Sequence, residues 1–502
     1  MTPRVALLLT VLLVPTGCAV GPRYKRPSTP QAREYKEAPA AALAAGQWKI
    51  AEPQDEAIRG KWWTVYGDPQ LDALEEQVTV SNQTIAQAEA QYRAVRASVR
   101  LARGDLFPSL SVAASATRAS GLTNRQAAQP GGAAPTVTSY QLPLDASWEP
   151  DVFGRVRRSV QSSIASAQAS AADLESVRLA MHGQLASLYF TLRGLDARDE
   201  LLRSTVTAYE SALQITTNRY NQGVASGVDV AQARAQLETT RAQQIDLSVD
   251  RAQAEHALAI LVGKVPAEFS LASHPLHEAP PEIPLVLPSQ LLERRPDVAA
   301  AERRVAAANA QVGVAQAAFF PSLALSATGG FQSSTLASFF SLPNRFWSLG
   351  ASLAETLFSG GKRRAAKAQA VAAYDADVAA YRESVLSALV DVEDNLAALR
   401  ILAAEAQQQT AAVDATDRLL SLARNRYQAG VTSYLEVTTA QSAAFANQRT
   451  AVDLLTRRML ASVSLIKALG GGWRVSDLPY GGASLAQRET TRSNDHATAG
   501  QP

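Results

Sequence analysis

The chain has 502 residues, of which 47% are hydrophobic and 19% are charged, and its formal net charge is +2 at pH 7. A balance this close to neutral, without a cationic block interleaved with aromatic residues, gives no support for nucleic-acid binding. No Walker loop and no dinucleotide-binding glycine loop occurs, which leaves no motif for a nucleotide-dependent enzyme.

The N-terminus predicts export. Arg4 precedes an apolar run at residues 5–14, which is too short to span a bilayer but has the length of a signal-peptide core. We assign residues 1–17 to a signal peptide. The next residue, Cys18, is the only cysteine, so no intrachain disulfide can form. Its place directly after a small residue resembles a bacterial lipobox, with Pro15 in the position of the usual aliphatic residue; the alternative is an ordinary signal peptide with an incidental cysteine.

The rest of the chain is a tandem duplication. The sequence Asn-Arg-Tyr-Asn-Gln-Gly-Val-Ala-Ser at residues 218–226 recurs as Asn-Arg-Tyr-Gln-Ala-Gly-Val-Thr-Ser at 425–433. A period of roughly 207 residues is far longer than a solenoid unit, so we expect one fold present twice. The expected segments are an N-terminal anchor and equatorial segment (18–70), repeat 1 (71–265), a proline-rich crossover (266–295), repeat 2 (296–473) and a disordered tail (474–502).

Each repeat is expected to contribute two β-strands. Apolar and polar residues alternate with the period of two that is typical of a strand with two different faces. Tyr140, Leu142 and Leu144, for example, alternate with Gln141 and Asp145. The four expected strands lie at about 108–118, 137–149, 321–332 and 346–358.

Four strands of about ten residues, apolar on one side and polar on the other, match transmembrane β-strands around a wet lumen. Four strands cannot close into a barrel, and an open edge in lipid leaves backbone groups unpaired at a cost of several kcal/mol each. A spanning sheet would therefore pool strands from two, three or more chains. The alternative is a soluble pair of β-hairpins packed on a helical core.

A long helical hairpin is expected after each strand pair, at about 155–263 and about 362–470. Both stretches lack proline and are rich in Ala, Leu, Gln and Arg. A helix over about 155–221 would be a rod of roughly 100 Å, and Gly223 and Gly430 would supply the chain reversals. Apolar residues recur at every seventh position, which predicts packing against neighbouring helices or an ordinary intramolecular coiled coil. These positions are Leu174, Met181, Leu188, Leu195, Leu202 and Tyr209.

The sequence gives little support for an enzyme. None of the five histidines lies in a nucleophile or zincin motif. His274 and His277 flank Pro275, which prevents the helix on which two histidines could share a face. We expect no enzyme, no cofactor and no metal site.

Further motifs are spread over about residues 18–473. They are residues 18–27, Trp62-Trp63 with Gly67-Asp68-Pro69-Gln70-Leu71, Leu287-Pro288-Ser289, Arg295-Pro296-Asp297 with Ala301-Glu302, Phe319-Phe320-Pro321, Leu357-Phe358 with Gly360-Gly361, and the two Tyr-x-x-Gly hairpin tips. In this order they resemble the outer-membrane efflux lipoproteins related to TolC, in the NodT-type lipoprotein branch.

This resemblance implies an α+β membrane fold in which a homotrimer forms a twelve-stranded β-barrel in the outer membrane and an α-helical barrel through the periplasm. It also implies passive export of drugs or other small molecules, a lipid anchor at Cys18, and two partners: a periplasmic adaptor (membrane fusion protein) and an inner-membrane transporter of the resistance-nodulation-division class. The alternatives are the exit duct of a type I protein secretion system and a periplasmic coiled-coil structural protein without a pore.

In that family a tyrosine, aspartates and an arginine close the channel at the hairpin tips. The resemblance places Tyr427 at the gate tyrosine, with Asp229 and Glu436 at the acidic positions of the two repeats. Thr432 and Thr439 stand where some relatives carry arginine and aspartate, so that ion pair is missing. Copies of the two carboxylates could form an acidic ring; alternatively they stabilise the first turns of the returning helices. The tip residues expected to contact the adaptor are Tyr220, Gly223, Gln428 and Gly430.

Basic residues follow the second and fourth expected strands. Cations in a first helical turn oppose the helix dipole, and anionic lipid headgroups would stabilise them. The alternative is a set of solvated charges at a chain reversal. Aromatic residues at the same interface could belong to a girdle. The candidates are Arg155, Arg157, Arg158, Lys362, Arg363 and Arg364, with Trp148 and Trp347 for the girdle.

Overall fold

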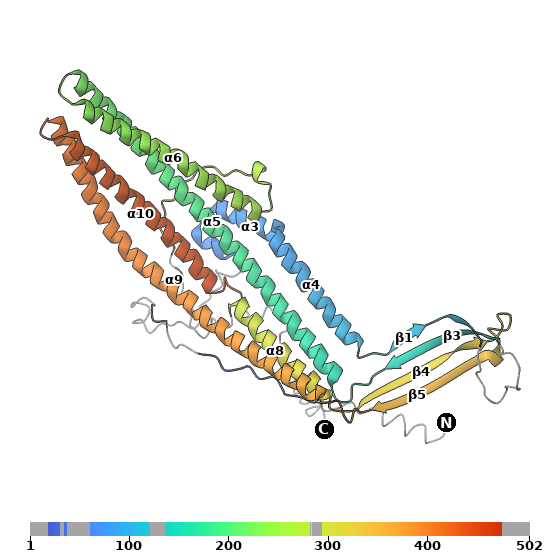
Figure 1. The fold of residues 1–502 in the computed structure, drawn as a ribbon. Helices are drawn as coiled ribbons and strands as arrows, with labels where there is room; N and C mark the ends of the chain where they lie inside the picture. Colours follow the sequence, from blue (N-terminus) through green and yellow to red (C-terminus); the bar gives the residue numbers. More distant parts are fainter. Residues whose placement is uncertain are drawn as a thin grey trace, which may run out of the picture. The chain divides into compact units, whose positions relative to one another are not determined.

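The structure is a computed structural model that describes residues 19–30, 35–37, 61–120, 136–281, 283 and 294–473. The expected signal peptide, Cys18 and the expected tail lie outside the described residues. The chain forms two compact units (Figure 1). The first contains Met1–Pro27, Arg93–Ala169 and Glu302–Ala380, and the second contains Ser28–Tyr92, Ser170–Ala301 and Tyr381–Pro502.

The helices and strands follow the duplication. Helices α5 and α9 have 67 residues each, and the helices that return from them, α6 and α10, have 35 residues each. The helical elements are η2 (Trp62–Tyr66), α3 (Pro69–Ser81), α4 (Gln83–Gly104), α5 (Arg155–Asn221), α6 (Gly227–Leu261), η3 (Pro266–Glu268), α8 (Pro296–Ala317), η4 (Leu342–Asn344), α9 (Lys362–Gln428) and α10 (Tyr434–Ala468). The strands are β1 (Ser109–Val112), β2 (Ser115–Ser120), β3 (Thr136–Trp148), β4 (Ser322–Ser333) and β5 (Arg345–Ala354). None of the described helices has both the length and the apolar character needed to cross a membrane.

The structure differs from the sequence expectation in three places. Helices α3 and α4 precede the first strand and α8 precedes β4, where no helix was expected. The first strand is divided into β1 and β2, because its middle lies opposite Pro143 of β3, which has no N–H to donate to the ladder. The last strand ends at Ala354, just before the charged Glu355 that interrupts its alternation.

The sheet keeps the two predicted faces separate. Its order is β1-β3-β4-β5, with β2 also paired to β3. Residues directly opposite each other share a face. Leu142, Ala146 and Trp148 lie opposite Phe331, Ala327 and Leu325, whereas Gln141, Asp145 and Ser147 lie opposite Gln332, Thr328 and Ser326. Among the described residues, neither β1 and β2 nor β5 has a strand on its outer side, so the sheet has two open edges.

Two adjacent glycines allow a matched test of this sheet. A Cβ on Gly330 would lie 2.9 Å from the Cα of Pro143, whereas a Cβ on Gly329 would lie 4.0 Å from its nearest neighbour, the oxygen of Phe346. Overpacking of this kind costs about 1–3 kcal/mol or more. We expect Gly330→Val to reduce the yield of folded protein several-fold, whereas Gly329→Val leaves the yield near the wild-type level. Equal loss in both variants would contradict this close strand approach.

The core of the second unit lies between helices. Trp62, Trp63, Leu71, Leu185 and Leu192 are among its most buried residues. Asp68 begins α3 by accepting hydrogen bonds from two main-chain N–H groups of its first turn, which satisfies donors that a helix start leaves free. The heptad stripe of α5 reaches this core, so the long helices pack through it.

A buried acid and histidine also lie in this core. Glu75 is fully buried on α3, and its Oε2 lies 2.6 Å from the Nδ1 of His182 on α5. The ring of Trp63 stacks on His182 at 4.6 Å between centroids. Burial raises the pKa of Glu75 to about 9, assisted by the nearby Asp72, and burial lowers the pKa of His182 to about 4. Both side chains are therefore neutral at pH 7.

This pair predicts a stability that falls as pH rises. Above pH 6.5 the histidine is neutral in the folded and unfolded states, whereas Glu75 keeps its proton up to about pH 9 only in the folded state. In this range the folded state holds one proton more than the unfolded state. The free energy of unfolding therefore falls by about 1.4 kcal/mol for each unit by which the pH rises. We expect the wild-type melting temperature to fall between pH 7 and pH 8.5, and Glu75→Gln to reduce that fall. An identical fall in both proteins would show that Glu75 is already ionised.

Candidate functional site

The two hairpin tips are built alike. Gly223 and Gly430 adopt φ angles of 73° and 76°, a left-handed conformation that favours glycine and ends each long helix. The amide of Val224 then donates to the carbonyl of Arg219 at 2.9 Å. In the second repeat, Val431 repeats this bond to Arg426 at 2.9 Å.

One arginine joins the two hairpins within the second unit. Arg219, near the end of α5, donates from Nη1 to the main-chain oxygen of Gln428 at 3.0 Å. Its guanidinium carbon lies 4.8 Å from the centre of the Tyr427 ring, so a cation–π contact accompanies the hydrogen bond. We call this contact of Arg219 with Tyr427 and Gln428 the inter-hairpin latch.

The latch covers a small apolar core. Tyr427 is only 6% exposed, and its ring meets that of Tyr434 at 5.3 Å in an edge-on arrangement. Ala233 from α6 packs with these rings and with Val437. Burial raises the pKa of Tyr434 to about 12, so this phenol is neutral. The core therefore joins α6 of the first hairpin to α9 and α10 of the second.

The predicted gate residues are not brought together within one chain. Asp229 forms a capping box with Ser226 at the start of α6, which is the alternative role considered for it. Glu436 lies in the first turn of α10, with Oε1 3.7 Å from Nη1 of Arg426. Of the three predicted gate residues, only Tyr427 lies in the interface between the hairpins.

Arg219 and Tyr434 were not among the predicted site residues, although the repeat carries a signal for both. Arg219 corresponds to Arg426, and Tyr434 stands where the first repeat has Gly227. A ring pair is therefore possible only in the second hairpin, and the arginine of the first hairpin covers it. Equivalent positions of the two repeats thus carry different residues, and this difference is the sequence signal for the latch.

Two polar atoms buried at the latch have no hydrogen-bond partner among the described residues. An unsatisfied buried polar group costs about 1–3 kcal/mol, so access of water on separation of the hairpins would offset part of the lost contact. These unpaired groups reduce the net stability of the latch contact. These atoms are Arg219 Nε and Tyr427 Oη.

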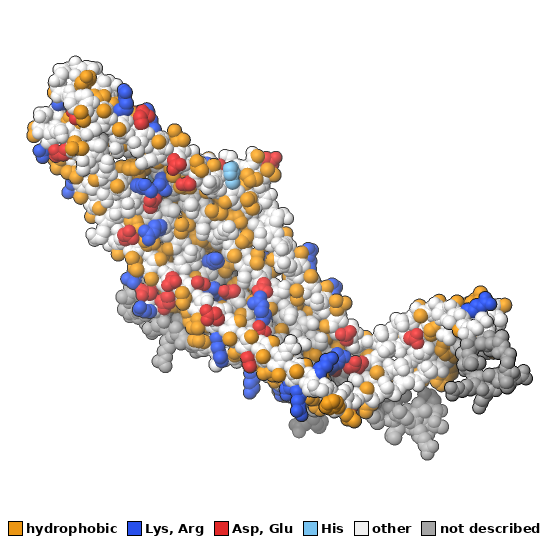
Figure 2. Space-filling view, in the orientation of Figure 1, with side chains coloured by type: hydrophobic (Ala, Val, Ile, Leu, Met, Phe, Trp, Pro, Cys, Tyr) orange, Lys and Arg blue, Asp and Glu red, His pale blue; other side chains and the backbone are white. Residues whose placement is uncertain are grey.

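Both tips expose apolar side chains at equivalent positions. Val224 is 62% exposed and its counterpart Val431 is 66% exposed. Val228 and its counterpart Leu435 are exposed to a similar degree, and so is Tyr220. Apolar and charged side chains lie close together at the ends of the hairpins in Figure 2. A repeated apolar surface at chain reversals is typical of an interaction site.

The basic residues after β3 are bound by groups of the chain itself. Arg155 Nη2 lies 2.9 Å from Glu149 Oε2, and Arg157 Nε lies 3.2 Å from Asp151 Oδ2. Arg158 is 7% exposed and donates from Nε and Nη2 to two main-chain oxygens of the N-terminal segment, each at 3.1 Å. These three charges are structural contacts at a chain reversal.

The residues after β5 behave differently. Arg363 Nη1 donates to Glu355 Oε1 at 2.7 Å. No hydrogen bond or ion pair joins the Arg364 side chain to the described part of the chain. Trp347 is 73% exposed on β5, whereas Trp148 is half-buried and donates from its indole to a main-chain oxygen. Among the described residues, the interface candidates with free functional groups are thus Lys362, Arg364 and Trp347.

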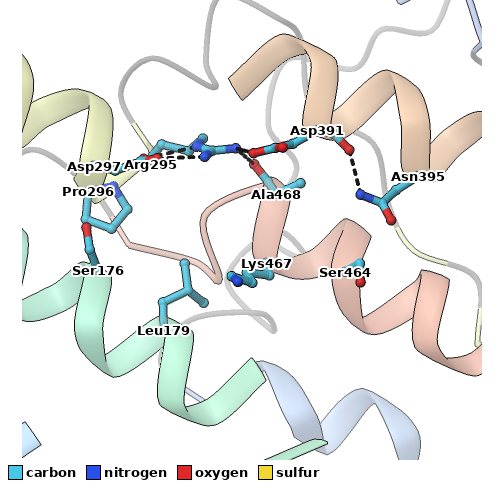
Figure 3. A pocket seen from close by; sticks show the side chains of 10 residues that line it. All are labelled: Ser176, Leu179, Arg295, Pro296, Asp297, Asp391, Asn395, Ser464, Lys467 and Ala468. Carbon is cyan, nitrogen blue, oxygen red and sulfur yellow. Dashed lines mark hydrogen bonds and ion pairs between the residues drawn. The ribbon is translucent and has the colours of Figure 1, made fainter. Parts of the chain in front are cut away.

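A cavity of about 330 Å³ lies in the second unit and contains a buried arginine (Figure 3). Arg295 pairs with Asp297 at 2.6 Å and with Asp391 at 2.9 Å, and it also donates to the main-chain oxygen of Ala468 at 3.3 Å. Its charge is therefore neutralised by α8 and α9, which makes it a structural link. Within the described residues, no group of three or more His, Cys, Asp or Glu side chains could hold a metal ion.

Comparisons with known proteins agree on one family. The family model for outer membrane efflux proteins matches residues 74–264 and 287–471. The chain is 33% identical to the toluene efflux pump outer membrane protein TtgF of Pseudomonas putida over 476 residues, or 94% of this chain and 97% of that protein. Among solved structures, the outer-membrane channel OprN is 31% identical with a TM-score of 0.80, over 91% of this chain and 100% of that chain. VceC of Vibrio cholerae is 29% identical with a TM-score of 0.75, over 82% and 99% of the two chains.

One explanation accounts for the duplicated hairpins, the two-faced sheet and these matches over nearly the whole chain. Such channels lie in the outer membrane, with a large helical part in the periplasm, and they are ducts without enzymatic activity. The chain belongs to the outer membrane efflux protein family and is the outer-membrane channel of an efflux system.

Proposed function

We propose that three copies of the chain assemble into one passive duct, with a twelve-stranded β-barrel in the outer membrane and an α-helical barrel in the periplasm. Two observations support this proposal. The sheet is apolar on one face and polar on the other, as a lipid-facing wall around a wet lumen requires. Its two open edges, at β1 and β2 and at β5, can pair between copies, which removes unpaired backbone groups from lipid.

The cargo follows from the nature of the duct. A wide passive channel does not select its substrates by a binding pocket, so drugs or other small molecules would leave the cell through it once a transporter delivers them. The toluene pump to which TtgF belongs by name is in keeping with such a cargo. The transporter would be an inner-membrane protein of the resistance-nodulation-division class, joined to the channel by a periplasmic adaptor.

The adaptor would bind the hairpin tips. The surface formed by Tyr220, Val224, Val228, Val431 and Leu435 is apolar and exposed in both repeats. Three copies would present six such tips in a ring, so an adaptor of matching symmetry would bury all of them. Apolar burial of about 25 cal/mol per Å² would stabilise the joint.

The tips would also gate the duct. The inter-hairpin latch would hold the hairpins of each copy together in the closed state. Asp229 and Glu436 would add negative charge at the constriction, which favours cations there. Opening would separate Arg219 from Tyr427 and Gln428 when the adaptor binds.

Lipidation of Cys18 would add an anchor beside the barrel. The described chain after it is bound to the start of the first helical hairpin, where Val20 donates its amide to the carbonyl of Phe153 at 3.1 Å. Gly154 makes room for Ala19, because a Cβ on it would lie 2.8 Å from the Cα of Ala19. Acyl chains on Cys18 would contribute about 0.8 kcal/mol of membrane affinity per buried methylene.

Photo-crosslinking in the native cell tests the partner assignment. A photo-reactive residue at Gln222 or Gln428, both exposed at the tips, should capture the adaptor of a drug-efflux system. The same residue at Gln408, exposed in the middle of α9, serves as the matched control and should capture much less. Mass spectrometry identifies the captured protein.

The other outcomes favour the alternatives. Capture of an adaptor that works with an ATP-binding-cassette transporter would favour the exit duct of a type I protein secretion system. Failure of both tip positions to capture any adaptor, with normal amounts of the channel present, would favour a structural protein without a pore.

A further inference from the structure

The start of α9 carries three cationic side chains that differ from the arginines that follow β3. Among the described residues, no hydrogen bond or ion pair reaches the side chains of Lys362, Arg364 or Lys367. Arg363, between them in sequence, instead donates to Glu355 at 2.7 Å and to the main-chain oxygen of Ala318 at 3.1 Å. The fold thus uses Arg363 for its own structure and leaves its neighbours available for an external anion.

Two of these cations line a groove of about 500 Å³ on α9. On α9, the other lining residues stand three, four, seven, eight and eleven positions after Arg364, and so they occupy one face of the helix. The floor is apolar, with Val371 38% exposed and Phe319 37% exposed. Asp375 lies eleven residues beyond Arg364, or about 16 Å along the helix. The groove therefore has a cationic end, an apolar middle and a distant carboxylate. The lining residues are Phe319, Arg364, Lys367, Ala368, Val371, Ala372 and Asp375.

The residues of the groove stand close in sequence to the start of β4 and to the end of β5, and all of them belong to the first unit. Phe319 stands three residues before β4, and Lys362 stands eight residues after the end of β5. Figure 2 shows Lys and Arg side chains next to hydrophobic ones where α9 meets the strands. In a chain whose sheet spans the outer membrane, this position coincides with the inner headgroup region.

We propose that this groove binds an anionic phospholipid of the outer membrane. Arg364 and Lys367 bind its phosphate, and one acyl chain lies against Phe319 and Val371. This occupant matches both parts of the groove, because a phosphate complements the cations while a hydrocarbon chain covers the apolar floor. The proposal rests on the membrane-spanning sheet of the proposed function and adds to it a defined lipid site.

Lipid binding by the purified full-length channel tests the site. Native mass spectrometry would compare retention of phosphatidylglycerol with retention of phosphatidylcholine. We expect a clear preference for phosphatidylglycerol that falls about 30-fold in Arg364→Gln/Lys367→Gln, since each cation near a lipid surface is worth about a factor of five. A Val371→Ser variant keeps the charges and should bind the lipid several-fold more weakly, which separates a lipid from a free inorganic anion.

The matched control is Arg234→Gln/Arg418→Gln, which removes the same charge from exposed positions on α6 and α9 and should keep the preference. A preference that survives in Arg364→Gln/Lys367→Gln, or that is lost equally in the control, would overturn the site. Channel conductance in bilayers is measured on the same samples. Intact conductance without any lipid preference would reject the site alone, whereas absence of conductance in the wild type would reject the proposed function.

Discussion

Arg219→Ala is expected to open the channel. The substitution removes a hydrogen bond from a charged donor, worth about 1.5–3 kcal/mol, together with a cation–π contact worth about 0.5–1 kcal/mol or more. A loss of about 2 kcal/mol shifts the equilibrium between the closed and open states about 30-fold toward the open state. Purified Arg219→Ala should therefore show a much higher open probability than the wild type in planar bilayers.

The duplication supplies the control for this prediction. Arg426 is the equivalent residue of the second repeat, and its nearest acid is Glu436 at 3.7 Å in an exposed pair. Such pairs contribute about 0–1 kcal/mol, so Arg426→Ala should change the open probability only slightly. Equal opening by both variants would show that loss of positive charge at the tips matters more than the latch.

Asp196→Ala is expected to cause the largest loss of stability. Asp196 is 1% exposed on α5 and lies between two arginines, with Oδ2 2.9 Å from Arg193 Nη1 and Oδ1 2.8 Å from Arg251 Nε. It also accepts the main-chain amide of His274 at 2.9 Å. Removal of the carboxylate leaves a buried arginine without its counter-charge, which costs about 3–5 kcal/mol.

This network also holds the crossover between the repeats. Arg193 donates to the main-chain oxygen of Ala272 at 2.8 Å, and Arg251 donates to that of Leu271 at 2.8 Å. The matched control is Asp199→Ala, one turn further along α5, whose partner Arg203 is 68% exposed and whose loss should cost less than about 1 kcal/mol. Thermal unfolding in detergent measures the stability of both variants. A melting temperature of Asp196→Ala within a degree or two of that of Asp199→Ala would contradict the buried network.

The sequence predicted most of the architecture because its signals are periodic. Alternation over 137–149 specified β3, and the absence of proline with a seven-residue repeat specified α5 and α9, since both patterns are written in consecutive residues. Helix α8 was missed although Pro296 and Asp297 mark its start, because its alanine-rich face lacks strong apolar periodicity. The division of the first strand depends on Pro143, a residue of another strand, and no local pattern reports it.

The candidate site was less predictable for a related reason. Tyr427 was identified by resemblance, but its partner Arg219 lies 208 residues away in sequence and is one of many arginines on helix surfaces. Asp229 and Glu436 carry a local signal for the first turn of a helix, and Asp229 does cap α6. Long-range contacts such as the latch depend on how two hairpins pack, which the local sequence does not encode.

Single-channel recording of the purified chain in planar bilayers tests the central claim most directly. An efflux duct formed by several copies should conduct ions in the absence of ATP or a proton gradient, and its conductance should be larger in Arg219→Ala. The mass of the conducting species, measured on the same sample, should be that of three chains. A well-folded protein that never conducts, in either the wild type or Arg219→Ala, would contradict the assignment as a channel.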